Sequence, residues 1–236
     1  MPIFGFYPDN SSPVEKELEK KVFRYSLIFP LFFTGLFWVM KIMESIFGFE
    51  SYKLGIYPLY PSTLTGILTA PLVHANYEHL IANSAPFLVL SAALSYFYRG
   101  LSYRIFWFIY FFSGRFVWIF GRPAWHIGAS GVIYGMASFL FFSGVFRSDT
   151  KLLTIALIVA FLYGGMFWGI FPFKEDMSWE AHFGGAIAGL FLAVIYRNRG
   201  PRRKEFEWET SESEDDEEFS DKTTDQENQN GPFPEK

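Results

Sequence analysis

The sequence predicts an all-α polytopic membrane protein with six transmembrane helices. The chain of 236 residues is 50% hydrophobic and includes 30 Phe, which is more apolar surface than the core of one soluble domain can hide. Six apolar runs come close to the roughly 20 helical residues that cross a bilayer. Lys and Arg residues are concentrated in every second connection between these runs. The absence of Cys excludes disulfides and thiolate metal sites.

The six apolar runs must be helical, because hydrocarbon offers no hydrogen-bond partner to the open edge of a strand. They are expected at Tyr25–Phe47, His79–Phe97, Tyr103–Phe120, Gly128–Phe146, Leu152–Phe171 and Ala181–Tyr196.

Three regions of different composition are expected along the chain. Residues 1–24 lack the charged start, short apolar run and cleavage site of a signal peptide, so the first helix should stay in the mature protein. Residues 25–197 form the membrane domain. Residues 198–236 are first basic and then acidic, and they are too poor in apolar side chains to order themselves, which predicts a disordered tail.

The distribution of Lys and Arg predicts the orientation. If the N-terminus is cytoplasmic, most basic residues lie on the cytoplasmic side. The outer side keeps Lys53, Arg115, Arg122 and Lys174, with Lys41 near the end of the first helix. Both termini are therefore expected in the cytoplasm. With no targeting peptide and a compact six-helix core, we expect the protein in a bacterial cytoplasmic membrane.

The first outer connection, residues 48–78, is too long to be a plain loop in a compact domain. Its segment PSTLTGILTAPLVH is apolar but interrupted by Pro and Gly. This pattern predicts a structure partly embedded in the outer leaflet rather than another span.

Polar residues occur near the outer starts of the second, fourth and sixth helices. His79 and Asn83 have i, i+4 spacing, so both side chains leave one side of the second helix. Ser130 and Tyr134 repeat this spacing on the fourth helix, and His182 lies near the start of the sixth. Three helices thus bring polar groups to a similar depth.

Two GxxxG steps determine which helices can approach closely, because small residues let helix backbones meet. The glycines concerned are Gly131 with Gly135 and Gly185 with Gly189. If these faces meet, Ser130 and His182 come within reach of each other. An imidazole there can take the proton of a serine that attacks a carbonyl. Donors to the resulting oxyanion could be His79, Asn83 and the backbone N–H of Ser130.

The segments HANYEHLIAN, GASGVIYG and AHFGGAIAG, in this order and topology, resemble the rhomboid family of intramembrane serine proteases over residues 25–197. The resemblance implies that Ser130 is the nucleophile and His182 the general base, without an acidic third member. It also implies that Tyr134 stacks on the base, and that His79 and Asn83 stabilise the oxyanion. His74 matches a further histidine of the family whose duty stays open, as does that of His126. A Trp-Arg pair found in some members is missing from residues 48–78.

Each residue also has a simpler interpretation. Ser130 alone could bond its own helix backbone, and His182 alone could be a polar contact between helices. His79 and Asn83 could be interfacial polar residues, and the glycines serve packing alone. Val132 excludes the GxSxG elbow of soluble esterases. All four histidines fall on the outer side, but there is no HExxH pattern and no nearby Asp or Glu on the helix faces concerned, so zinc or haem is not favoured.

The sequence therefore predicts an intramembrane serine endopeptidase that cleaves transmembrane segments of other membrane proteins through an acyl-enzyme. Its expected partners are such substrates and the lipid bilayer; no cofactor, metal or nucleic acid is expected. The main alternative is a catalytically silent rhomboid-like protein that binds client transmembrane helices. A transporter is disfavoured because the polar groups gather at one end of the bundle rather than at the midplane.

Overall fold

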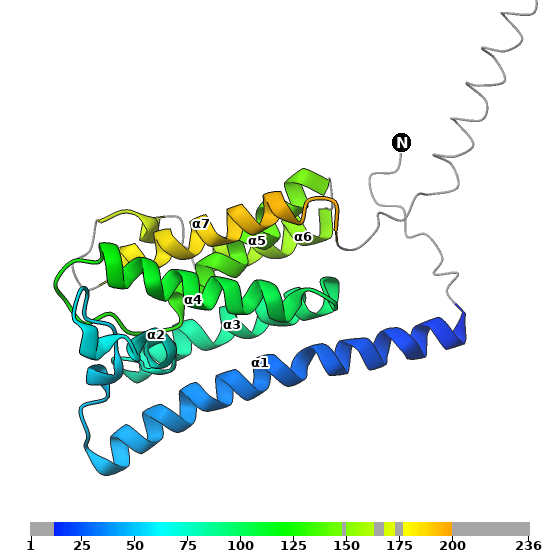
Figure 1. The fold of residues 1–236 in the computed structure, drawn as a ribbon. Coiled ribbons are helices and arrows are strands. Elements are labelled where there is room, and N and C mark those ends of the chain that lie inside the picture. Colours follow the sequence, from blue (N-terminus) through cyan, green and yellow to red (C-terminus); the bar gives the residue numbers. More distant parts are fainter. Residues whose placement is uncertain (1–11, 148–149, 163–167, 173–176, 200–236) are drawn as a thin grey trace, which may run out of the picture. The chain divides into compact units, whose positions relative to one another are not determined.

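The computed structural model describes residues 12–147, 150–162, 168–172 and 177–199. The predicted disordered tail, apart from its first two residues, lies outside the described residues. Within the described part the secondary structure is helical, with one isolated bridge between Ile56 and His126. Six helices have 13 or more residues (Figure 1): α1 Pro13–Phe47, α3 Tyr77–Phe97, α4 Ser102–Phe120, α5 Ser130–Arg147, α6 Thr150–Leu162 and α7 Trp179–Ile195.

These helices confirm the predicted all-α polytopic bundle. By length and apolar composition, α1, α3 and α5 can each cross a membrane, and α7 is a shorter apolar helix. Large apolar side chains remain exposed along the outside of the bundle, which a soluble fold would avoid. Examples are Phe32, Ile42, Ile81, Phe161 and Phe191.

The predicted bounds are wrong at two helices. α1 begins 12 residues before Tyr25, because Ser12 and Glu15 form a capping box and Pro13 occupies the first helical position. The apolar run predicted only the part of this helix that suits a bilayer. α6 ends at Leu162 in the described residues, and Trp168–Ile170 form a separate short 3-10 helix, η4, instead of continuing to Phe171.

The connection between α1 and α3 is folded rather than a plain loop. It contains η1 Ser51–Leu54, η2 Pro61–Thr63, α2 Gly66–Thr69 and η3 Ala70–Leu72. The hydroxyl of Tyr110 on α4 donates to the carbonyl of Leu68 at 2.5 Å, which ties the connection to the bundle. Its partial embedding in the outer leaflet stays a prediction.

Aromatic side chains fill the centre of the bundle. Phe33 and Phe37 from α1 contact Phe87 of α3, and Phe106 of α4 contacts both Phe33 and Phe87. Phe37, Phe87 and Phe106 are each 1% exposed. This core holds α1, α3 and α4 together, while α5 and α7 meet through glycines described below.

Candidate functional site

α5 and α7 are in direct backbone contact. A Cβ built on Gly185 would lie 1.9 Å from the carbonyl oxygen of Gly131, and one on Gly189 would lie 2.1 Å from that of Gly135. No side chain larger than hydrogen fits at these two α7 positions without moving the helices apart. The contact places the first turn of α7 beside the first turn of α5.

Ser130 and His182 meet at this contact. Ser130 is the first residue of α5, and His182 lies in the first turn of α7. Their Oγ and Nε2 atoms are 2.8 Å apart, within hydrogen-bond distance. The His182 side chain is buried, with 4% of the residue exposed.

The other ring nitrogen of His182 determines the tautomer. Nδ1 lies 2.8 Å from the carbonyl oxygen of Gly169 in η4. A carbonyl only accepts, so Nδ1 carries the proton and Nε2 presents its lone pair to the hydroxyl of Ser130. Gly169 was missed at the sequence level, since no motif surrounds it and its segment was expected inside a helix.

Tyr134 holds the imidazole from one face. Its ring lies parallel to that of His182, with centroids 4.1 Å apart and an angle of 7°. Gly169 packs tightly against this pair, because a Cβ there would lie 2.1 Å from the Tyr134 hydroxyl and 3.1 Å from His182 Nδ1. The stacking and the carbonyl contact together leave the imidazole little freedom to rotate.

Gly128, two residues before Ser130, brings the chain into contact with the His79 ring. Gly128 has φ +104°, a left-handed conformation that disfavours a side chain. A Cβ there would lie 2.8 Å from Cε1 and 2.9 Å from Nε2 of the His79 ring. The missing side chain thus lets the first turn of α3 pack directly against the segment that leads into α5.

Asn83 lies one turn after His79 on α3. Its amide donates to the carbonyl of His79 at 2.8 Å, and its Oδ1 has no partner among the described residues. The residue is 4% exposed. An amide NH₂ group has a second hydrogen, so Asn83 can still donate to a bound group.

A polar network fastens the α4–α5 connection to the start of α7. Glu180, which is 1% exposed, accepts from the backbone N–H of Arg122 at 3.1 Å and pairs with its Nε at 3.8 Å. The Arg122 guanidinium also donates to the carbonyl of Met177 at 2.6 Å. Sequence reasoning missed these residues. The available signal was Glu180, an acidic residue two positions before His182 at the start of a predicted membrane helix.

His126 belongs to the same network. Its Nδ1 is 2.6 Å from the hydroxyl of Ser178, and its Nε2 is 3.1 Å from the carbonyl of Arg122. Burial lowers the pKa of His126 below its ordinary value, which favours the neutral ring. The four histidines are not gathered into one cluster, and no group of three or more His, Asp or Glu suited to a metal occurs among the described residues.

The model of the Rhomboid domain family matches residues 61–199. An uncharacterized protein of Mycobacterium tuberculosis is 36% identical over 186 residues, which cover 74% of this chain and 75% of that protein. An uncharacterized protein of Mycobacterium leprae is 34% identical over 187 residues, 74% of this chain and 72% of that protein. The chain is thus a multi-pass membrane protein that belongs to the rhomboid family.

Proposed function

We propose that this protein is an intramembrane serine endopeptidase that cleaves transmembrane segments of other membrane proteins. The observation that carries the proposal is the 2.8 Å contact between Ser130 Oγ and His182 Nε2, with Nδ1 held by the carbonyl of Gly169. Membership of the rhomboid family supports an intramembrane protease or a related rhomboid-like function. The Nε2 lone pair that faces the Ser130 hydroxyl favours a protease over a catalytically silent relative.

In the proposed acylation step, Ser130 Oγ attacks the carbonyl carbon of the scissile peptide and its proton passes to His182 Nε2. The carbonyl of Gly169 accepts a hydrogen bond from Nδ1–H and so favours the imidazolium that forms. The tetrahedral intermediate then collapses, the C–N bond breaks, and His182 returns its proton to the leaving amine. The products are an acyl ester on Ser130 and a free amino terminus.

The oxyanion of that intermediate needs donors in a site with little water. The backbone N–H of Ser130 lies at the start of α5, where helix N–H groups lack intrahelical acceptors. His79 Nε2 and the second amide hydrogen of Asn83 are the further donors in the proposal. Each such donor lowers a barrier of this type by about 3 kcal/mol.

Deacylation reverses the roles. A water gives its proton to His182 Nε2 while its oxygen attacks the ester carbon. The ester C–O bond then breaks, His182 returns the proton to Ser130 Oγ, and the new carboxyl terminus leaves as a carboxylic acid that ionises in water. Substrates would partly unwind before cleavage, because an intact helix hides its amides in its own hydrogen-bond ladder.

We also propose where the protein lies in the cell and how its domains are arranged. Both termini lie in the cytoplasm, residues 1–24 and 198–236 flank a membrane domain of residues 25–197, and the membrane is the bacterial cytoplasmic one. The basic residues in alternate connections and the mycobacterial relatives support this arrangement.

A serine-directed fluorophosphonate probe tests the proposed function. The folded wild-type protein should be labelled, and Ser130→Ala and His182→Ala should not be, with melting temperatures close to wild type. Cleavage of single-span reporter proteins in liposomes should be lost in the same two variants. A folded wild-type protein that neither labels nor cleaves, yet binds reporter helices, would instead support the silent client-binding alternative.

A further inference from the structure

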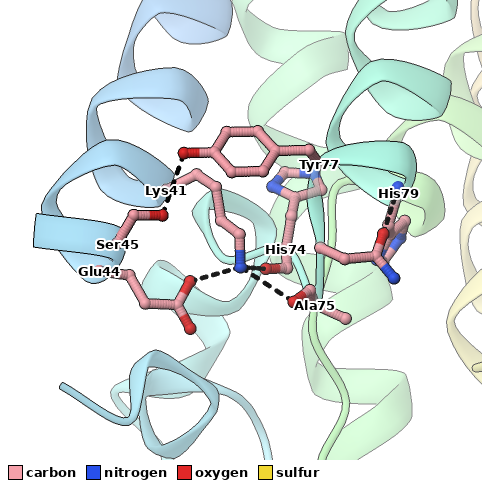
Figure 2. A network of polar contacts seen from close by, with 8 residues as sticks. Lys41, Glu44, Ser45, His74, Ala75, Tyr77 and His79 are labelled. Atoms are coloured by element: carbon pink, nitrogen blue, oxygen red, sulfur yellow. Dashed lines mark hydrogen bonds and ion pairs between the residues drawn. The ribbon is translucent and has the colours of Figure 1, made fainter. Parts of the chain in front are cut away.

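α1 carries a buried ammonium group that the proposed reaction does not use. Lys41 is 8% exposed, on the face of α1 that also buries Phe37. Its Nζ donates to Glu44 Oε2 at 2.7 Å, to the carbonyl of His74 at 3.1 Å and to that of Ala75 at 2.9 Å (Figure 2). All three ammonium hydrogens are therefore used, as a buried charge requires.

The two carbonyls belong to the residues just before α3. Among the described residues, the Lys41 ammonium is the hydrogen-bond donor to both of them. The next residue, Asn76, caps α3, and its side chain accepts from the backbone N–H of His79 at 2.7 Å. The backbone that Lys41 binds is thus linked to His79 through Asn76 and the hydrogen bond between its side chain and the His79 N–H.

A second route leads from the same segment to the same histidine. The ring of His74 lies edge-to-face against the His79 ring, with centroids 5.2 Å apart. It is tilted against the Phe37 ring, also at 5.2 Å. Burial lowers the pKa of His74 to about 3, so this ring stays neutral beside the ammonium. Fixing the backbone of residue 74 therefore also fixes the position of the ring that packs against the His79 ring.

α1 holds this segment at two successive turns. Ser45 follows Lys41 by four residues on the same helix face, and its hydroxyl lies 3.0 Å from that of Tyr77 in the first turn of α3 (Figure 2). Lys41 thus holds this segment at residues 74 and 75, and Ser45 holds it at Tyr77. The first turn of α3 is thus attached to α1 by side chains of two types.

We propose that Lys41 is a positioning residue, whose ammonium fixes the backbone of residues 74–76 and thereby the orientation of His79 toward the oxyanion. This inference rests on the proposed function, in which His79 is a donor. Lys41 touches neither Ser130 nor substrate in it. The role is to keep a catalytic donor aligned before the reaction begins, which avoids reorganisation in the transition state.

The test compares Lys41→Met with a matched control. Met keeps the apolar stem and removes all three donors. Lys53→Met removes a lysine that is also paired with a glutamate three residues away, Glu50, but that pair is exposed and distant in sequence from α3. Labelling by the fluorophosphonate probe and reporter cleavage are measured in the same detergent, together with the melting temperature.

The expected result is a kcat about 10- to 100-fold lower for Lys41→Met, with KM little changed, because a donor displaced by about 1 Å costs this much in the transition state. Lys53→Met should keep the wild-type kcat. In a His79→Ala background, Lys41→Met should lower kcat by less than about 2-fold more, since its target is already gone. Lys41→Arg should recover part of the loss.

Several results would overturn the inference. Wild-type kcat in folded Lys41→Met is one, and an equal loss with and without His79 is another. If Lys41→Met does not fold, Asn76→Ala cuts the same link after the lysine, and wild-type kcat in that variant rejects the proposal. Failure of the proposed function is a different outcome, because then the wild-type protein itself shows neither labelling nor cleavage.

Discussion

Replacing Gly185 by Ala would test whether the contact between α5 and α7 holds the candidate site together. The new Cβ would start 1.9 Å from the carbonyl oxygen of Gly131, and real Cβ atoms essentially never approach closer than 3.0 Å. The neighbour is backbone rather than the end of a flexible side chain. The two helices must therefore separate by about 1.1 Å, the difference between these two distances.

A shift of this size matters because the Ser130–His182 contact lies on the same two helices. That contact is 2.8 Å long, so a similar lengthening takes it to about 3.9 Å, beyond hydrogen-bond distance. A misplacement of about 1 Å can cost about 100-fold in rate. Forcing an extra methyl group into this contact also lowers the free energy of unfolding by about 1–3 kcal/mol.

The assay combines thermal unfolding in detergent with the rate of labelling by the fluorophosphonate probe. Gly35→Ala is the control, because Gly35 is also in a helix but a Cβ there meets nothing within 4 Å. It should label at the wild-type rate and melt at the same or a higher temperature, since Ala favours a helix interior over Gly by about 1 kcal/mol. Wild-type melting and labelling in Gly185→Ala would refute the reasoning about backbone contact.

Three further predictions concern separate parts of the bundle. Asn83→Ala should lower kcat about 100-fold without abolishing labelling, since one oxyanion donor of several is lost; full activity would remove Asn83 from the site. Glu180→Ala should lower the free energy of unfolding by about 1–3 kcal/mol, because the partly buried N–H of Arg122 loses its acceptor; an unchanged melting temperature would contradict this. Burial lowers the pKa of His74 from an ordinary 6.5 to about 3 in the folded protein. Between these two pH values the unfolded chain binds a proton at His74 that the native chain does not bind. The free energy of unfolding therefore falls as the pH drops from 6.5 toward 3. His74→Leu should weaken this acid destabilisation by up to about 1.4 kcal/mol per pH unit in melting experiments, and an equal pH slope in both proteins would count against it.

The helices could be predicted from the sequence because an apolar run and its length are local properties. α3 and α4 begin within two residues of the predicted starts and end where predicted. The start of α1 was also encoded locally, in the capping box of Ser12 and Glu15, but an apolar run alone does not reveal it. Membership of the family likewise followed from short segments whose order is visible in the chain.

The sequence by itself determined the helical membrane bundle and which polar residues begin its helices, since spacing along a helix decides which side chains share a face. Only the tertiary structure decided what those residues touch. The carbonyl of Gly169 meets His182 from 13 residues away, Glu180 meets Arg122 across 58, and Lys41 reaches Ala75 across 34. Such contacts arise where segments pack together, and no local pattern of residues specifies which buried donor meets which backbone carbonyl.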